Sequence, residues 1–215
     1  MNWNIFDKER FELLKKITET VSLDNYYMIG GTALSLQLGL RESFDFDFCV
    51  PTYFNNEVLL EELRKLGTVE VKQNQKGTCD VILNGVQVSF FYYPNKVIKN
   101  FVKTNEIENL RMASILDIAV MKVTAIGGRG AKKDFFDLYN ILNMEDISVV
   151  DLAEGLIQKC GNNINYFNTI MGLSYFEDAE QELLPKTYVE FDWNKIKEFF
   201  VKFQSEFQEQ LENLL

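Results

Sequence analysis

Strand patterns are confined to the first part of this 215-residue chain, and only helical patterns follow Pro94. Short apolar or alternating runs between turn residues predict strands, whereas apolar residues spaced by three and four predict helices. Strands are expected at 26–29, 43–50, 69–73, 78–83 and 86–93, and helices at 6–20, 32–38, 56–66, 105–126, 132–142, 150–159 and 193–215. We therefore expect an α/β half over residues 1–100 and a helical half over residues 101–215.

The composition restricts the chemistry that such a fold could carry. The chain has no histidine, which excludes Ser-His-Asp and Cys-His catalysis and nearly all zinc sites. Chemistry near neutral pH must then rest on carboxylates, lysines, tyrosines, cysteines or a hard metal ion. A net charge of −10 argues against a protein that coats nucleic acid by bulk electrostatics, although a local basic groove is compatible with it.

Three features of the sequence indicate a cytoplasmic protein. No apolar run reaches membrane-spanning length, and the N-terminal segment is charged and amphipathic, unlike a signal peptide. The three cysteines, Cys49, Cys79 and Cys160, are odd in number and far apart, as expected for reduced thiols.

The segment from Phe44 to Phe48 alternates strictly between aromatic rings and the acids Asp45 and Asp47. In a strand, this spacing puts both carboxylates on one face, about 6.6 Å apart along the chain. Such a face is either solvent-exposed sheet surface or the binding face for something positive. Because the rings predict a central strand with one buried face, we favour a binding role for the two acids.

A second signal lies one short helix upstream, where a strand runs through Gly30, Gly31 and Thr32 into the helix at 32–38. Alone, such glycines usually make only a tight turn. The N-terminus of a helix nevertheless presents unpaired N–H groups that suit phosphate. Two convergent carboxylates suit Mg²⁺, which fills its remaining positions with water and substrate phosphates. Together the two signals predict a site for a nucleoside triphosphate with Mg²⁺.

The same residues resemble the Gly-Ser/Thr…Asp-x-Asp signature of the DNA polymerase β-like nucleotidyltransferase superfamily. More narrowly, the sequence is similar to the AbiEii/AbiGii-type toxin family in four blocks. These are "GGTALSLQLGLRESFDFDF", "NGVQVSFFYYP", "SILDIAVMKVTAIGGRGAKKDFFDLYNIL" and "YFEDAEQELLPKTYVEFDWNKIKEFF". The resemblance implies an α+β fold, with a polymerase β-like core of a mixed sheet and flanking helices, followed by a C-terminal helical lobe.

The resemblance also implies an activity: transfer of a nucleoside monophosphate from a nucleoside triphosphate to an acceptor hydroxyl. It makes Asp45 and Asp47 the Mg²⁺ ligands and catalytic residues, and it makes Gly30, Gly31 and Thr32, with Arg41 and Ser43 in the following turn, the nucleotide-binding residues. Some relatives are toxins paired with an antitoxin protein, and some modify transfer RNA. RNA, protein and an antitoxin are therefore candidate partners, and no membrane is implied.

One position departs from the superfamily pattern. Related enzymes usually supply a third carboxylate from a neighbouring strand, where this chain has Ser89. Asp80, across the Asn84-Gly85 hairpin, is the nearest acid in the sequence. Either Asp80 or another group substitutes, or one metal suffices, or the protein binds nucleotide without turning it over. A catalytically inert nucleotide- or partner-binding protein is the alternative function.

The third block contributes candidates from the helical half. Lys122 lies in an apolar helical run, where a lysine needs a partner or a phosphate. Lys133 and Asp137 are spaced as an ordinary helical ion pair. By resemblance, Lys122 and Lys133 would bind the nucleotide. An RNA acceptor would contact a local basic patch formed by Lys96, Lys99, Lys103 and the segment 129–133. Ser114 and Asp117 fit a helix cap, which favours a structural over a catalytic role for Asp117.

Overall fold

The computed structural model describes all residues 1–215, and the chain forms two compact units. The first comprises Met1–Asn95 and Asn100–Ala113, and the second comprises Lys96–Lys99 and Ser114–Leu215. The sequence places the boundary near residue 100, whereas residues 100–113 group with the first unit. The reason is that this segment adds two short strands to the sheet.

The first unit is built on a mixed seven-stranded sheet with the order β3-β4-β5-β2-β1-β7-β6. The strands are β1 (Tyr27–Ile29), β2 (Phe46–Val50), β3 (Val69–Gln75), β4 (Thr78–Leu83), β5 (Val86–Tyr92), β6 (Val102–Lys103) and β7 (Arg111–Met112). Strand β2 is central and pairs antiparallel with β1 and parallel with β5. The helices of this unit are α1 (Lys8–Thr20), α2 (Gly30–Leu38) and α3 (Asn56–Arg64), preceded by a short 3-10 turn at Trp3–Ile5.

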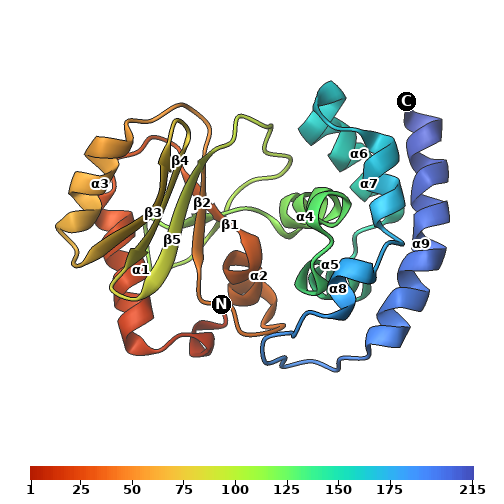
Figure 1. Ribbon diagram of the computed structural model, residues 1–215, viewed down its shortest axis with the longest axis horizontal. Helices are drawn as coiled ribbons and strands as arrows, with labels where there is room; N and C mark the ends of the chain where they lie inside the picture. Colours follow the sequence, from red (N-terminus) through yellow and green to blue (C-terminus); the bar gives the residue numbers. More distant parts are fainter. The chain divides into compact units, whose positions relative to one another are not determined.

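One face of this sheet is packed with aromatic rings. Figure 1 shows α1 and α3 together on one side of the strands. The side chains of Phe46, Phe48 and Phe90 are fully buried, and the Phe48 and Phe90 rings stack with centroids 4.9 Å apart. Because side chains alternate along a strand, Asp47 and Ser89 project from the opposite face. The predicted central strand with one buried face is confirmed.

Two predicted turns are also confirmed. The β4–β5 hairpin turns at Asn84 and Gly85, whose φ angles of 51° and 83° are the positive values that this turn requires. Helix α2 ends at Gly39, which adopts the left-handed conformation with a φ of 69°.

The helix predicted at 105–126 is wrong over its first ten residues. Strand β7 occupies Arg111–Met112, and Ala113 donates its N–H to the carbonyl of Met28. Helix α4 (Ile115–Arg129) begins only after Ser114, whose hydroxyl accepts the N–H of Asp117 as predicted for a cap. Strands of two residues are too short to show a period in the sequence.

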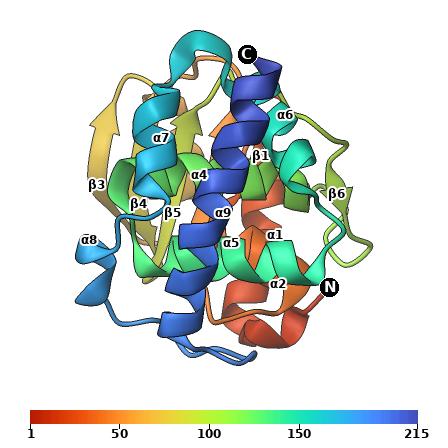
Figure 2. The ribbon, with the colours of Figure 1, turned by 90° about the vertical axis from the view of Figure 1, so that its right-hand side faces the viewer.

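The second unit is helical. After α4 it contains α5 (Lys132–Met144), α6 (Val149–Cys160), a 3-10 turn (Gly161–Asn163), α7 (Tyr166–Gly172), α8 (Glu177–Glu180) and α9 (Trp193–Leu214). Helix α9 runs across α5, α6 and α7, as Figure 2 shows. Its buried residues, Ile196, Phe200, Phe203, Phe207 and Leu211, repeat every three or four positions, so one stripe of α9 closes the core of this unit. Helices α7 and α8 were not predicted.

The chain contains no helix with both the length and the apolar character needed to cross a bilayer.

Candidate functional site

The two acids of the alternating segment lie at the start of β2, and Asp47 projects from the face opposite the aromatic core. Asp45, just before the strand, is exposed, and Asp47 is half-buried. In the strand register Asp47 is paired with Ile29 of β1 on one side and with Ser89 of β5 on the other. Ser89 is in turn paired with Asp80 of β4. The sheet therefore arranges Asp47, Ser89 and Asp80 in one row across three neighbouring strands.

The carboxylate of Asp47 packs directly against the turn between β1 and α2. A Cβ atom added to Gly30 would lie 2.8 Å from Oδ2 of Asp47, and Gly30 has a φ of +75°. Both the close approach and the backbone angle require glycine at this position. The sequence pattern therefore has a geometric cause, because only glycine allows the acid to reach the start of α2.

Gly31 likewise leaves room for the cationic side chain of Arg41 at the start of α2. A Cβ atom on Gly31 would collide with Nη2 of Arg41 and would lie 2.8 Å from Oγ of Ser43. Thr32 donates its hydroxyl to Oγ of Ser43 at 3.0 Å. The predicted residues of the first unit are thus brought together, since Gly30, Gly31, Thr32, Arg41 and Ser43 all surround the start of α2 beside Asp47.

The Arg41 guanidinium is buried and held in place by the backbone. The residue is only 3% exposed, and its Nη1 donates to the carbonyl of Glu42 at 2.9 Å. Ser35 of α2 donates its hydroxyl to the carbonyl of Arg41 at 2.8 Å. A fixed, buried guanidinium beside a helix start is suited to binding phosphate oxygens.

The N-terminus of helix α2 also favours the binding of an anion. Its N-cap residue, Ile29, has no side-chain acceptor for the first N–H groups of the helix. These N–H groups and the helix dipole favour an anion at this point. The arrangement combines an anion-binding helix start and the Arg41 guanidinium with the Asp47 carboxylate on the adjacent strand and the Asp45 carboxylate just before that strand.

The acids fit a magnesium ion bound mostly through substrate and water. No group of three or more histidine, cysteine, aspartate or glutamate side chains is arranged to hold a metal ion. Mg²⁺ in nucleotide sites commonly uses one or two carboxylates together with substrate phosphates and water. Asp45 and Asp47, next to an anion-binding turn, match that ligand set rather than an all-protein metal cage.

Ser89 occupies the position where the resemblance predicts a third acid. Its side chain is 1% exposed, and its Oγ donates to Oδ1 of Asp80 at 3.1 Å. Gln87 also donates its Nε2 to Asp80, at 3.3 and 3.4 Å from the two carboxylate oxygens. Asp80 thus lies two strands away from Asp47 and is hydrogen-bonded to Ser89 on the strand between them. The contribution of Gln87 was not predicted, because it follows from pairing between β4 and β5.

In the second unit, Lys122 has the partners that its apolar surroundings require. Its Nζ lies 2.8 Å from Oδ1 of Asp134 and 2.6 Å from Oδ2 of Asp137, and all three side chains are buried. Arg129 adds bonds to Asp134 from Nε at 2.7 Å and Nη2 at 3.0 Å. Although burial opposes ionisation, the charges of Lys122 and Arg129 lower the pKa of Asp134 to about 2. The two acids of this cluster were not predicted as a unit.

The predicted basic segment at 129–133 exposes less charge than the sequence suggests. Lys133 is exposed, and Asp137 pairs with Lys122 instead of with Lys133. Lys132 is buried and donates its Nζ to the carbonyls of Glu180 and Glu182 at 3.1 and 2.7 Å. Only Arg129 and Lys133 therefore present a cation to solvent from this segment. Asp117 is buried and pairs with Lys159 at 2.7 Å, which agrees with its predicted structural role.

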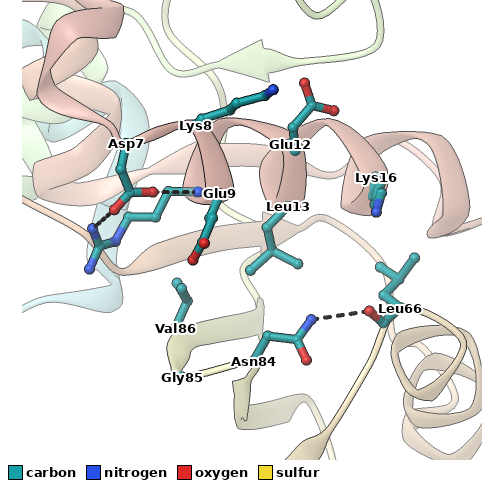
Figure 3. Close-up of a pocket in the computed structure, with 11 residues that line it drawn as sticks. Asp7, Lys8, Glu9, Glu12, Leu13, Lys16, Leu66, Asn84, Gly85 and Val86 are labelled. Carbon is teal, nitrogen blue, oxygen red and sulfur yellow. Dashed lines mark hydrogen bonds and ion pairs between the residues drawn. The ribbon is translucent and has the colours of Figure 1, made fainter.

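A separate pocket of about 440 Å³ lies between the start of α1 and the turn of the β4–β5 hairpin. Figure 3 shows Leu13 pointing toward Asn84, which donates to the carbonyl of Leu66. The charged residues that line it, Asp7, Lys8, Glu9, Arg10, Glu12 and Lys16, include both signs. None of the predicted site residues lies in this pocket, so it is not part of the candidate site.

The chain is similar to known proteins over most of its length. Residues 12–213 match the family model described as nucleotidyl transferase AbiEii toxin of a type IV toxin–antitoxin system. An uncharacterised protein of Aquifex aeolicus is 34% identical over 204 residues, which is 94% of this chain and 97% of that protein.

Two solved structures share the fold. MenT4, a nucleotidyltransferase toxin of Mycobacterium tuberculosis H37Rv, superimposes with a TM-score of 0.61 at 15% identity, over 94% of this chain and 85% of that one. A proposed nucleotidyltransferase of H. pylori superimposes with a TM-score of 0.55 at 16% identity, over 98% and 99% of the two chains. The fold is therefore the expected polymerase β-like nucleotidyltransferase fold.

Proposed function

The chain belongs to the AbiEii nucleotidyltransferase toxin family, and from this premise we propose that it transfers a nucleoside monophosphate from a nucleoside triphosphate to an acceptor hydroxyl. In this reaction the acceptor oxygen forms a bond to the α-phosphorus, the bond to the β-phosphate breaks, and pyrophosphate leaves. The observation that carries the proposal is the contact between the Asp47 carboxylate and Gly30 at the start of α2.

Each residue around this contact has a proposed role. Asp45 and Asp47 hold Mg²⁺, which would neutralise charge on the phosphates of the bound nucleotide. The turn formed by Gly30, Gly31 and Thr32 donates its N–H groups to phosphate oxygens at the helix start. Arg41 and Ser43, which lie against Gly31, supply a cation and a hydroxyl to the same phosphates. Such catalysis rests on positioning and electrostatics, which a chain without histidine can provide.

For the missing third acid, we propose that Asp80 contributes through Ser89. Two strand spacings separate Asp80 from Asp47, or roughly 10 Å between their backbones. Asp80 is therefore badly placed to share one Mg²⁺ with Asp47. The Ser89 hydroxyl donates to Asp80, so its lone pairs are available to accept a hydrogen bond from a group beside Asp47.

In the helical unit we propose Lys122 and Lys133 as further nucleotide-binding residues. The side chain of Lys133 is exposed, so its ammonium group is available to a phosphate. Lys122 would have to leave Asp134 or Asp137 to do so, and that exchange would couple nucleotide binding to the buried ion-pair cluster.

The proposed partners follow from the family. Its toxins are counteracted by an antitoxin, and MenT4 is itself named a toxin. We propose that this chain acts in the cytoplasm as the toxin of such a pair, with an RNA such as tRNA, or a protein, as the acceptor. An RNA would contact only a few basic side chains, because the chain carries a net charge of −10.

The test is incubation of the protein with each α-³²P-labelled nucleoside triphosphate, Mg²⁺, and total cellular RNA and protein. We expect label in an RNA or protein band with one or more nucleotides, release of pyrophosphate, and loss of both signals in EDTA. The alternative, an inert nucleotide-binding protein, predicts saturable binding of the triphosphate without pyrophosphate release. Absence of both binding and transfer would contradict both functions.

A further inference from the structure

Two cations lie directly opposite each other at the β6 edge of the first unit. Lys103 of β6 and Arg111 of β7 are paired in the antiparallel register, where like charges repel and destabilise the pair. Neither side chain forms an ion pair in the structure. Arg111 donates only to the amide oxygen of Asn25, at 3.3 Å, and its guanidinium lies 5.6 Å from the centroid of the Phe101 ring.

A buried hydroxyl without a partner lies beside this pair. Tyr26 is 8% exposed, and its OH is buried with no hydrogen-bond partner. Its ring is fixed against the rings of Phe48 and Phe90, with centroids 5.4 and 6.1 Å away. Burial raises the pKa of Tyr26 to about 12, so the hydroxyl keeps its proton and can donate a hydrogen bond. A buried donor without an acceptor is costly to the fold.

These groups line one pocket of about 280 Å³. The lining residues are Thr18, Tyr26, Lys103, Glu108, Asn109 and Arg111. Glu108 is the only acid among them, and its side chain is exposed. Two unneutralised cations, an amide and an unpartnered hydroxyl donor form the donor set that an oxyanion requires.

We propose that this pocket binds a phosphate group, held by Arg111 and Lys103 and by the hydroxyl of Tyr26. The pocket is distinct from the candidate site, because Tyr26 precedes β1 whereas Gly30 follows it. Four residues of extended chain separate the two, or roughly 13 Å. Inorganic phosphate and the phosphodiester backbone of RNA share the chemistry required. The proposal holds whether or not the protein transfers nucleotides.

The direct test is titration of ¹⁵N-labelled protein with sodium phosphate at constant ionic strength, with chloride replaced stepwise. We expect saturable shifts of the amide signals of Lys103, Asn109 and Arg111, with the signals of Gly30 to Thr32 followed as a second site. Arg111→Gln should weaken the affinity at this pocket at least about tenfold, the loss of a charged hydrogen bond. Lys16→Gln, which removes a lysine from α1 outside the pocket, should leave it unchanged.

The variant Tyr26→Phe tests whether the unpartnered hydroxyl binds phosphate or is only a defect in packing. Removing the unpartnered hydroxyl should raise the melting temperature in phosphate-free buffer and also weaken phosphate binding. If Tyr26→Phe lowers the melting temperature, or binds phosphate as well as the wild type, the role given to the hydroxyl is wrong. Non-saturable shifts, or equal shifts in wild type and Arg111→Gln, would overturn the site.

A second arm identifies the source of the phosphate. An RNA oligonucleotide added to phosphate-saturated protein should displace the inorganic ion if the pocket holds an RNA backbone. Unchanged occupancy with RNA present would assign the pocket to a free phosphate compound. Because neither arm measures transfer, failure of this site and failure of the proposed activity are distinguishable.

Discussion

Asp47 and Gly30 are in direct contact, with the position of a Cβ on Gly30 only 2.8 Å from Oδ2 of the carboxylate. Gly30→Ala should therefore displace Asp47 and abolish nucleotide binding. The positive φ of +75° should add a loss of about 1 kcal/mol in the free energy of unfolding. Urea unfolding and binding of a labelled triphosphate measure the two effects.

Gly85→Ala is the matched control for this prediction. Gly85 has a similar φ of +83°, but a Cβ there would meet nothing within 4 Å. We expect a similar loss of stability with nucleotide binding retained. Full nucleotide binding by Gly30→Ala would show that the close approach of Asp47 is irrelevant to the site.

The hydrogen bond from Ser89 to Asp80 gives a prediction about the missing acid. Asp80→Asn should lower the rate of transfer while the protein stays folded, because a neutral amide is a weaker acceptor for the Ser89 hydroxyl than a carboxylate. Ser89→Asp should destabilise the metal-free protein by about 1 kcal/mol or more, since it buries an acid between two others. It should also raise transfer at low Mg²⁺ if a second ion limits the rate.

Magnesium titrations of transfer and urea unfolding in EDTA provide these measurements. Glu70→Gln, on the neighbouring β3 but exposed, serves as the control for loss of an acid. Unchanged transfer and magnesium dependence in both Asp80→Asn and Ser89→Asp would refute the role given to this pair.

The buried cluster of the helical unit predicts a pH dependence of stability. The folded pKa of Asp134 is about 2, below the ordinary value of 3.8. Ionised Asp134 therefore stabilises the folded protein above about pH 4, and this contribution to the free energy of unfolding is lost as the pH falls toward 2. From the size of the shift, it amounts to about 2 kcal/mol. Asp134→Asn should be less stable at pH 7, and its unfolding free energy should fall less between pH 4 and pH 2.

Urea unfolding at a series of pH values tests this, with Asp146→Asn as a control because Asp146 is exposed between α5 and α6. A wild-type profile that is flat between pH 4 and pH 2, or identical in Asp134→Asn, would contradict the ion pairs of Asp134.

If the acceptor is RNA, its binding should depend weakly on salt. Only Arg129 and Lys133 expose charge from the segment 129–133, in addition to surface lysines such as Lys103. For about three phosphates neutralised, the slope of log K against log salt should be about −2. A filter-binding series in KCl measures it, and a slope of about −6 or steeper, which requires about eight neutralised phosphates, would contradict this prediction.

Local sequence patterns predicted the centre of the first unit well. The period-two alternation from Phe44 to Phe48 predicted a strand with one buried face, and the glycines predicted the turn beside it. Both patterns depend only on residues that are close together in the sequence. The strands at Val102–Lys103 and Arg111–Met112 were not predicted, because two-residue strands exist only through pairing with β1 and with each other.

Long-range pairing also explains what could not be predicted around the candidate site. The order of β4, β5 and β2 places Ser89 between Asp47 and Asp80, which no spacing in the sequence reveals. Likewise, Lys122 meets Asp134 and Asp137 only because α4 packs on α5. The sequence showed that Lys122 needed a partner but not which residue provides it.

The most direct test of the central claim is Mg²⁺-dependent transfer of α-³²P-labelled nucleotide by Asp45→Asn and Asp47→Asn beside the wild type and Asp146→Asn. These substitutions keep the shape of the side chain and remove one charge. We predict transfer by the wild type and by Asp146→Asn, and none by either strand variant, with melting temperatures equal to or above that of the wild type. Full transfer by either strand variant would contradict the assignment of Asp45 and Asp47 as the metal-binding, catalytic pair.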